Sequence, residues 1–173
     1  MKHTHYTKNA SQFIIDNLDI IPKGRLLDLA MGHGRNAVFL AEMGFEVEGI
    51  DISGDALDKA RDLAEKNNVQ IKTYHADLEG DNPIERNGYD VIICFNYLQR
   101  SLVPQIKEGL RNGGIIVYET FIIDQIQFGR PRNPEYLLKY NELLHMFSDF
   151  RCLRYREGIV ENRKAVASII AEK

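Results

Sequence analysis

Residues 26–54 read LLDLAMGHGRNAVFLAEMGFEVEGIDISG. A short apolar run ends at Asp28, a turn with Gly32 and Gly34 follows, and an amphipathic stretch leads to a second apolar run that ends at Asp51. This order predicts a β-α-β unit with one acid after each strand. In a parallel sheet, such a unit forms a pocket for a nucleotide-like ligand at the carboxyl ends of the strands.

The glycine turn alone does not identify that ligand. Residues 32–37 fit the dinucleotide pattern G-x-G-x-x-G/A, and Asp51 lies about where that pattern has its ribose-binding acid. The same glycines would also serve a plain tight turn. Asp28 separates the ligands, because the pyrophosphate of a dinucleotide would meet a nearby like charge at this helix N-terminus. S-adenosylmethionine carries a sulfonium and an ammonium, which an acid attracts, although Asp28 could also cap the turn.

With these residues in view, the chain resembles the class I S-adenosylmethionine-dependent methyltransferases. Within them it is similar to the small group related to the tellurite-resistance methyltransferase. That group typically reads D-L-G-C-G-x-G-R-N in the first loop, and residues 28–36 here read DLAMGHGRN. The Gly-Arg-Asn ending is the more discriminating part. Ala30 replaces the usual first glycine and Met31 the usual cysteine, and the alanine narrows the space beside the methionine end of the cofactor.

The resemblance implies S-adenosylmethionine as the cofactor and a role for several side chains. Asp51 would accept hydrogen bonds from both ribose hydroxyls, and Ile52 would pack on the adenine face. Asp77 and the backbone of Leu78 would bind the adenine edge, although Asp77 could instead form the turn before Gly80. The predicted cofactor-binding residues are Asp28, Ala30, Gly32, Gly34, Asn36, Asp51, Ile52, Asp77, Leu78 and Phe95.

Composition limits the class of protein. The chain has 173 residues, 44% of them hydrophobic and 27% charged, which predicts a single globular domain over residues 1–173. A formal net charge of −3 gives no sign of nucleic-acid binding, and the apolar runs are too short to cross a membrane. Cys94 and Cys152 lie in apolar runs and are expected to be buried in a reducing compartment. We therefore expect a cytoplasmic protein without a nucleic-acid or membrane partner.

Short apolar runs alternate with amphipathic stretches along the chain. This alternation predicts an α/β fold with a doubly wound, Rossmann-like sheet of seven strands, mostly parallel with an antiparallel last strand. The last strand is antiparallel because only the short turn at 161–163 precedes it, and a plain dinucleotide-binding domain would not usually end in such a hairpin. Strands are expected at 25–29, 46–50, 69–74, 89–95, 115–121, 151–159 and 164–172, and helices at 9–18 (within an N-terminal segment 1–20), 34–43, 54–66, 101–111 and 139–147.

Polar residues follow the fourth and fifth predicted strands, where the methyl group would meet its acceptor. The polar ends of the Asn96 and Tyr97 side chains would lie over apolar residues. Alternatively, Asn96 caps the next helix and Tyr97 packs beneath it. Glu119 is an acid in an apolar strand end. It could be a general base with a raised pKa, hold an ammonium substrate, or pair with an arginine. The predicted catalytic residues are Glu119, Tyr97 and Asn96.

Residues 122–138 form a proline-containing segment that we interpret as a substrate lid. Arg130 and Arg132 lie two residues apart, stiffened by Pro131 and Pro134. Arginine forks bind carboxylates and oxyanions bidentately, so these two arginines and Arg100 are the predicted substrate-binding residues. The alternative is a solvated basic loop that pairs with surface acids.

These observations favour an S-adenosylmethionine-dependent methyltransferase acting on a small molecule, with an anionic or thiol/chalcogen acceptor. A soft acceptor needs no strong base, whereas an oxygen or nitrogen acceptor would need Glu119 or Tyr97 to remove a proton. A non-catalytic S-adenosylmethionine-binding module is the alternative, and an NAD-dependent oxidoreductase is a weaker one. The Asn/Asp-Pro-Pro-Tyr/Phe motif of nucleic-acid amino methylation is absent. No metal site is predicted, because His3 and His5 lack further ligands.

Overall fold

The fold is built on one seven-stranded sheet, in a computed structural model that describes residues 10–81 and 83–173. The strands lie in the order β3-β2-β1-β4-β5-β7-β6, and every neighbouring pair is parallel except those that β7 makes with β5 and β6. This arrangement confirms the predicted fold class. The strands are β1 (Arg25–Leu29), β2 (Glu46–Asp51), β3 (Lys72–His75), β4 (Tyr89–Phe95), β5 (Leu110–Phe121), β6 (Arg151–Val160) and β7 (Lys164–Glu172).

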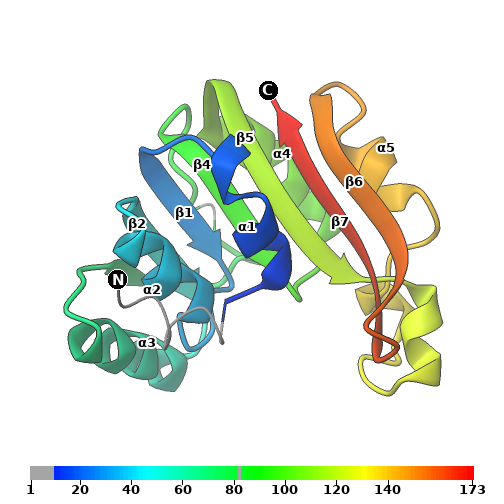
Figure 1. The fold of residues 1–173 in the computed structure, drawn as a ribbon, viewed down its shortest axis with the longest axis horizontal. Helices are drawn as coiled ribbons and strands as arrows, with labels where there is room; N and C mark the ends of the chain where they lie inside the picture. The colour runs from blue at the N-terminus through cyan, green and yellow to red at the C-terminus, as the bar shows by residue number, and fades with distance from the viewer. Residues whose placement is uncertain (1–9, 82) are drawn as a thin grey trace.

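Helices cover both faces of the sheet. In Figure 1, α1 lies in front of the sheet and α4 behind it. The buried side chains of α1, α2 and α3 belong to one core cluster and those of α4 and α5 to another, so the sheet separates two apolar layers. The helices are α1 (Gln12–Asp16), α2 (Arg35–Glu42), α3 (Gly54–Lys66), α4 (Val103–Gly109) and α5 (Glu142–Met146), with 3₁₀ turns η1 (Leu18–Ile20), η2 (Arg100–Leu102), η3 (Ile123–Gln127) and η4 (Pro134–Tyr136).

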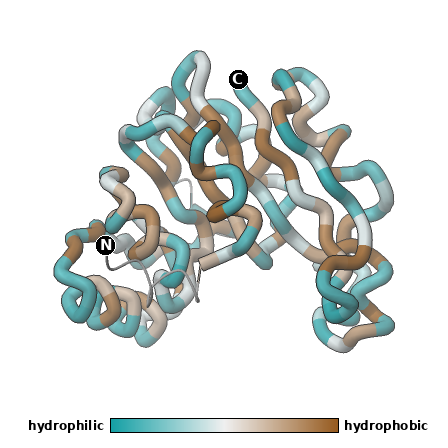
Figure 2. Tube along the Cα trace, viewed as in Figure 1, coloured by the Kyte–Doolittle hydropathy of each residue, from teal (hydrophilic) through white to brown (hydrophobic). Residues whose placement is uncertain are grey.

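The apolar runs decide the positions of the central strands. β4 is buried along almost its whole length, as its continuous apolar run predicted. Figure 2 shows the same pattern, with hydrophobic residues concentrated on the central strands and hydrophilic ones on loops and outer helix surfaces. Ser53 caps α3 as expected, because its side chain accepts a hydrogen bond from the Ala56 N–H at 3.2 Å. None of the helices in the described residues is long and apolar enough to cross a membrane.

Several predicted element ends differ from the structure. The strand expected at 69–74 is β3 at Lys72–His75, and the helix expected at 139–147 is α5 at Glu142–Met146. The helix expected over 101–111 ends at Gly109, and β5 begins at Leu110 rather than at residue 115, so that Gly113 and Gly114 lie inside the strand. These glycines pair with the end of β7: the Gly113 N–H donates to the Lys173 carbonyl at 3.0 Å, and the Lys173 N–H to the Gly114 carbonyl at 2.9 Å. The pairing of β4 with β5 shifts register at this point. At the other end of the chain, the expected helix over 9–18 is shorter, at Gln12–Asp16, and residue 9 lies outside the described residues.

One predicted burial is also wrong. Cys94 is buried in β4 as expected, but Cys152 is exposed. The reason is its strand, since β6 is the edge of the sheet and pairs only with β7. The connection between those strands is the short turn that the sequence predicts, with positive φ at Glu161 and Asn162.

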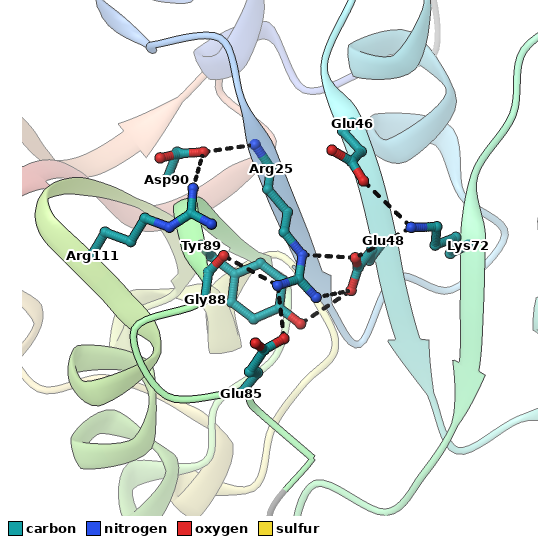
Figure 3. Close-up of polar contacts among 9 residues, drawn as sticks. All are labelled: Arg25, Glu46, Glu48, Lys72, Glu85, Gly88, Tyr89, Asp90 and Arg111. Carbon is teal, nitrogen blue, oxygen red and sulfur yellow. Dashed lines mark hydrogen bonds and ion pairs between the residues drawn. The ribbon is translucent and has the colours of Figure 1, made fainter.

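A closed polar network lies at the amino ends of β1, β2 and β4 (Figure 3). Glu48 is buried, and Arg25 contacts its two oxygens from Nε at 2.8 Å and from Nη2 at 3.2 Å. The Tyr89 hydroxyl donates to Glu48 at 3.1 Å. Asp90 accepts from the Arg25 N–H and from Arg111, both at 2.8 Å. These contacts satisfy the buried charge and tie the three strands together at the end opposite the strand carboxyl ends.

Candidate cofactor and acceptor site

The carboxyl ends of β1, β2 and β4 open on a cleft with two lobes. The first lobe has a volume of about 730 Å³ and the second about 350 Å³. Ala30 and Tyr97 line both lobes and therefore mark the neck between them. The first lobe is lined by Asp28, Ala30, Met31, Gly32, His33, Arg35, Asn36, Leu63, Phe95, Asn96 and Tyr97, and the second by Ala30, Asp51, Ile52, Ala76, Asp77, Leu78, Glu79 and Tyr97.

The turn after β1 has three residues in the left-handed region, each with a different consequence. Gly32 has φ 56° and donates its N–H to Asp51 at 2.8 Å. Gly34 has φ 79°, and a Cβ there would lie 2.8 Å from the Cβ of Ala60, so α3 packs against this turn. Ala30 has φ 52°, which costs an L-residue roughly 1–2 kcal/mol. Ala30 was recognised from the sequence as the replacement of a glycine, but its left-handed backbone conformation was not predicted.

Asp28 is the buried acid of the first lobe, with 2% of its surface exposed. Burial raises the pKa of Asp28 to about 8; the nearby Arg35 opposes this effect and Asp51 adds to it. At neutral pH the carboxyl group therefore holds a proton in the free chain. A cation placed in the first lobe would favour the ionised form. Without such a cation the carboxyl group is neutral, which differs from the like charge that was expected to repel a pyrophosphate.

The second lobe combines acids with an exposed apolar side chain. Asp51 accepts from the Gly32 N–H and, on its other oxygen, from the Ser53 N–H at 2.9 Å. Ile52 beside it is 62% exposed, which gives the lobe an apolar shelf suited to a planar ring. Asp77 accepts from the Glu79 N–H at 2.9 Å and so forms the turn, while it also lines the lobe next to the buried Leu78.

Asn36 joins the first lobe to the N-terminal helix. It is buried in α2, and its side-chain oxygen accepts from the Ser11 N–H at 2.8 Å, just before α1. This bond places the start of α1 next to the lobe. Asn36 therefore lines the lobe as predicted, but its amide oxygen serves the fold as well.

The residues after β4 form the floor of the cleft. Phe95 and Asn96 line the first lobe, and the Asn96 N–H donates to the Glu119 carbonyl at 2.9 Å. The Tyr97 carbonyl accepts from the Tyr118 hydroxyl at 2.8 Å, which fixes the backbone at the neck. Burial, together with the charges of Glu79 and other acids, raises the pKa of Tyr97 to about 12. The phenol keeps its proton at neutral pH and suits a hydrogen-bond donor better than a base.

Glu119 does not have the raised pKa predicted for a general base. It lines neither lobe, and its carboxylate accepts from Ser168 at 2.6 Å, from Lys164 at 2.9 Å and from Arg156 at 3.1 Å. Burial alone would raise its pKa, but these hydrogen bonds and the Lys164 charge hold the pKa of Glu119 below its ordinary value. The alternative of pairing with an arginine is confirmed, and a lysine joins the pair.

Arg100 is not available to a substrate, contrary to the prediction. Its guanidinium contacts both oxygens of Glu142, at 2.5 and 3.1 Å, and donates to the carbonyls of Glu135 and Leu137. Arg100 therefore anchors the 122–138 segment, which is closed at its base by a bridge between Ile122 and Leu138.

Arg130 and Arg132 are exposed on the 122–138 segment and line neither lobe. Their role in substrate binding, and that of the segment as a lid, stay predictions. No group of three or more His, Cys, Asp or Glu in the described part of the chain could hold a metal ion, and His3 and His5 lie outside that part.

Several residues of the cleft were not predicted from the sequence, and neither were Arg156 and Lys164, the two cations that bind Glu119. Met31, His33, Arg35 and Leu63 line the first lobe without having been predicted. Arg156 and Lys164 converge on Glu119 from the terminal hairpin. The alternation of residues 154–157, Arg-Tyr-Arg-Glu, was a usable signal for Arg156, because side chains two apart in a strand share a face.

Comparison with known proteins agrees with this geometry. Residues 1–168 match the sequence model of a family described as "Tellurite resistance protein TehB". A Haemophilus influenzae protein named "Probable S-adenosyl-L-methionine-dependent methyltransferase TehB" is 30% identical over 159 residues, which cover 87% of this chain and 54% of the relative. The chain thus spans about half the length of the curated relatives it matches first.

Solved structures share the fold. The crystal structure of TehB from Haemophilus influenzae matches with a TM-score of 0.82 at 24% identity, over 98% of this chain and 64% of that chain. An S-adenosylmethionine-dependent methyltransferase from Mesorhizobium loti matches with a TM-score of 0.76 at 17% identity, over 98% of this chain and 100% of that one. Both matches place the seven-stranded sheet among Rossmann-like methyltransferase folds.

Proposed function

Because this chain belongs to the TehB family, we propose that it transfers a methyl group from S-adenosylmethionine to a small acceptor molecule. Membership confirms the resemblance seen in the sequence, and the name of the Haemophilus influenzae relative supports S-adenosylmethionine as the cofactor. The observation that carries the proposal is the two-lobed cleft, which is lined by an acid from the carboxyl end of β1 and by another from the carboxyl end of β2. The buried Asp28 suits a cationic ligand, because a cation beside it would favour its ionised form, whereas an anionic pyrophosphate would not.

The cleft fits the proposed cofactor part by part. The second lobe would hold the adenosine, with Asp51 at the ribose hydroxyls and Ile52 and Asp77 at the adenine. The first lobe would hold the methionine end, with Asp28 near its ammonium. Ala30 and Tyr97 at the neck would lie beside the sulfur. When bound, S-adenosylmethionine supplies an activated methyl group on a sulfonium.

The residues of the chain favour an acceptor that needs no general base. Glu119 is held ionised in its cation cluster, and Tyr97 keeps its proton at neutral pH. The main contribution of the site is then alignment of the cofactor and the acceptor in the cleft. A thiolate or another chalcogen anion forms its bond to the methyl carbon as the methyl–sulfonium bond breaks. The products are the methylated acceptor and neutral S-adenosylhomocysteine, and a thiol releases its proton to solvent.

Turnover tests the proposal. The purified chain would be incubated with S-adenosylmethionine and a panel of thiols, selenite, tellurite and alcohols, and S-adenosylhomocysteine quantified. We expect product with a thiol or chalcogen acceptor, at least tenfold less with Asp51→Ala, and no change with Asp55→Ala, an exposed acid in the first turn of α3. Binding of S-adenosylhomocysteine without turnover of any acceptor would favour the non-catalytic module instead.

A further inference from the structure

A row of paired residues crosses four strands, starting at the floor of the first lobe. Phe95 of β4 pairs with Glu119 of β5, Glu119 with Ser168 of β7, and Ser168 with Arg156 of β6. Directly paired residues share one face of a sheet, and adjacent strands lie about 4.8 Å apart. The row therefore leads from the lining of the cleft to the edge of the sheet on a single face.

Together with Lys164, which also binds Glu119, this row carries an excess of positive charge. The Glu119 side chain is 2% exposed, whereas those of Arg156 and Lys164 are 37% and 30% exposed. One buried carboxylate thus holds two cations whose outer sides reach solvent. Within the described residues, Arg156 donates from Nε to Ser168 and from Nη2 to Glu119, and Lys164 donates to Glu119. Since a guanidinium has five N–H donors and an ammonium three, both cations retain donors for an anion.

The cations lie on the face of the sheet that carries α1. The Arg156 guanidinium lies over the ring of Phe13, 5.0 Å from its centroid. The same helix begins after Ser11, which Asn36 ties to the first lobe. In Figure 1, α1 lies in front of the sheet, and no helix of the described residues lies in front of β7 and β6 to its right. The cation pair therefore shares one face of the sheet with Phe95 at the floor of the first lobe, although neither cation lines the lobe itself.

We propose that Arg156 and Lys164 bind the carboxylate of the methyl acceptor, with Glu119 as the positioning residue that holds both cations in place. This inference rests on the proposed function and names its substrate class. Because Glu119 is one strand from Phe95 and Ser168 is two, the carboxylate lies on the order of 5–10 Å from the floor of the lobe. The acceptor is a small organic acid whose nucleophilic atom is several bonds from its carboxylate. An oxyanion whose nucleophilic centre bears the charge matches this separation less well.

Calorimetry with an unreactive product analogue tests this inference directly. The probe is 3-(methylthio)propionate, added to the chain with and without saturating S-adenosylhomocysteine, and compared with the neutral 3-(methylthio)propan-1-ol. We expect the acid to bind at least tenfold more tightly than the alcohol. Arg156→Gln and Lys164→Gln should each remove most of that preference. Arg154→Gln is the matched control, since it lies on the same strand and its guanidinium contacts only the Leu153 carbonyl among the described residues.

The outcomes separate this inference from the proposed function. Equal binding of acid and alcohol, absence of binding of either, or an acid preference that survives both substitutions would overturn the carboxylate site while S-adenosylhomocysteine binding stays intact. Failure of S-adenosylhomocysteine to bind would count against the proposed function instead. Thermal unfolding of each variant verifies folding, and two independent cation variants ensure that one unfolded protein does not decide the result.

Discussion

The two ends of the sheet each bury a carboxyl group, but the surroundings of the two groups differ. Glu48 at the amino ends and Asp28 at the carboxyl end of β1 are each 2% exposed. Arg25 and Tyr89 bind Glu48 directly (Figure 3). Asp28 faces a lobe of about 730 Å³ and has a pKa raised to about 8 by burial. Equal burial therefore has different consequences: one acid is satisfied by the fold, and the other remains available to a ligand.

The largest expected effect comes from removing the cation that binds Glu48 at the amino ends of the strands. Arg25→Ala would leave Glu48 buried without its main cation, which typically costs about 3–5 kcal/mol of the free energy of unfolding. Lys72→Ala is the control, because Lys72 also lies within 4.0 Å of Glu48 but is 61% exposed, and such pairs contribute about 0–1 kcal/mol. Urea unfolding measures both. Similar losses in the two variants would contradict the account of this network.

The next effect concerns the pH dependence of S-adenosylhomocysteine binding at the carboxyl ends of the strands, where Asp28 lies. Because the ammonium of S-adenosylhomocysteine favours ionised Asp28, binding should release a proton below pH 8. The affinity should then rise with pH, by up to about tenfold per unit between pH 6 and 8. Asp28→Asn should bind more weakly and without this slope. Calorimetry in buffers of different ionisation enthalpy counts the proton, and a flat wild-type profile would exclude the proposed role of Asp28.

The raised pKa of Asp28 also makes the stability of the free chain depend on pH. Stability should fall as the pH rises, whereas the affinity for the ligand should increase. The folded-state pKa of Asp28, about 8, lies above its unfolded value of about 4, so the folded chain binds the extra proton. The stabilising contribution is fully present below pH 4 and is lost as the pH rises to about 8. Asp28→Asn should abolish this component in urea unfolding across that range, and an unchanged pH profile would refute it.

A smaller effect is expected at Glu119, whose pKa is lowered in the folded chain. Its ionised form contributes stability above the unfolded pKa of about 4.3, and this contribution is lost as the pH falls through the folded pKa. Glu119→Gln should reduce the acid-induced loss of stability, measured by thermal unfolding between pH 3 and 6. Glu135→Gln, an exposed acid on the 122–138 segment, is the control. An identical acid limb in both variants would contradict the ion cluster.

The smallest effect is expected at Ala30. Ala30→Gly relieves a left-handed alanine worth roughly 1–2 kcal/mol, offset by roughly 0.5–1 kcal/mol of glycine entropy. The net change should be a stabilisation of about 0 to 1.5 kcal/mol. Ala41→Gly within α2 is the matched control and should destabilise by about 1 kcal/mol, since its backbone is helical. Equal losses in the two variants, measured in urea, would mean that the Ala30 backbone is not strained.

Local patterns predicted the parts of the molecule that local physics decides. The strands at 25–29 and 89–95 were placed correctly because their apolar runs are continuous and bounded by turns. The start of β5 was placed too late, at residue 115, because Gly113 and Gly114 pair with the distant Lys173, which no local pattern reveals. The exposure of Cys152 likewise depends on which strand forms the sheet edge.

The site shows the same division. The acids and glycines that follow β1 and β2 line the cleft because the topology of a parallel sheet puts them there. The partners of the Glu119 and Arg100 side chains were not predicted, since they lie 35 to 49 residues away along the chain. Packing between distant segments determines which charged residues pair. A charge that is paired in this way stabilises the fold and is less available to a substrate.

The most direct test of the contrast between the two ends is calorimetric binding of S-adenosylhomocysteine and of NADH. We predict micromolar binding of S-adenosylhomocysteine alone, weakened at least tenfold, about 1.4 kcal/mol, by Asp51→Ala in the open cleft. Lys72→Ala at the closed end should leave that binding unchanged. Binding of NADH alone, or an Asp51→Ala variant that binds S-adenosylhomocysteine like the wild type, would contradict the account.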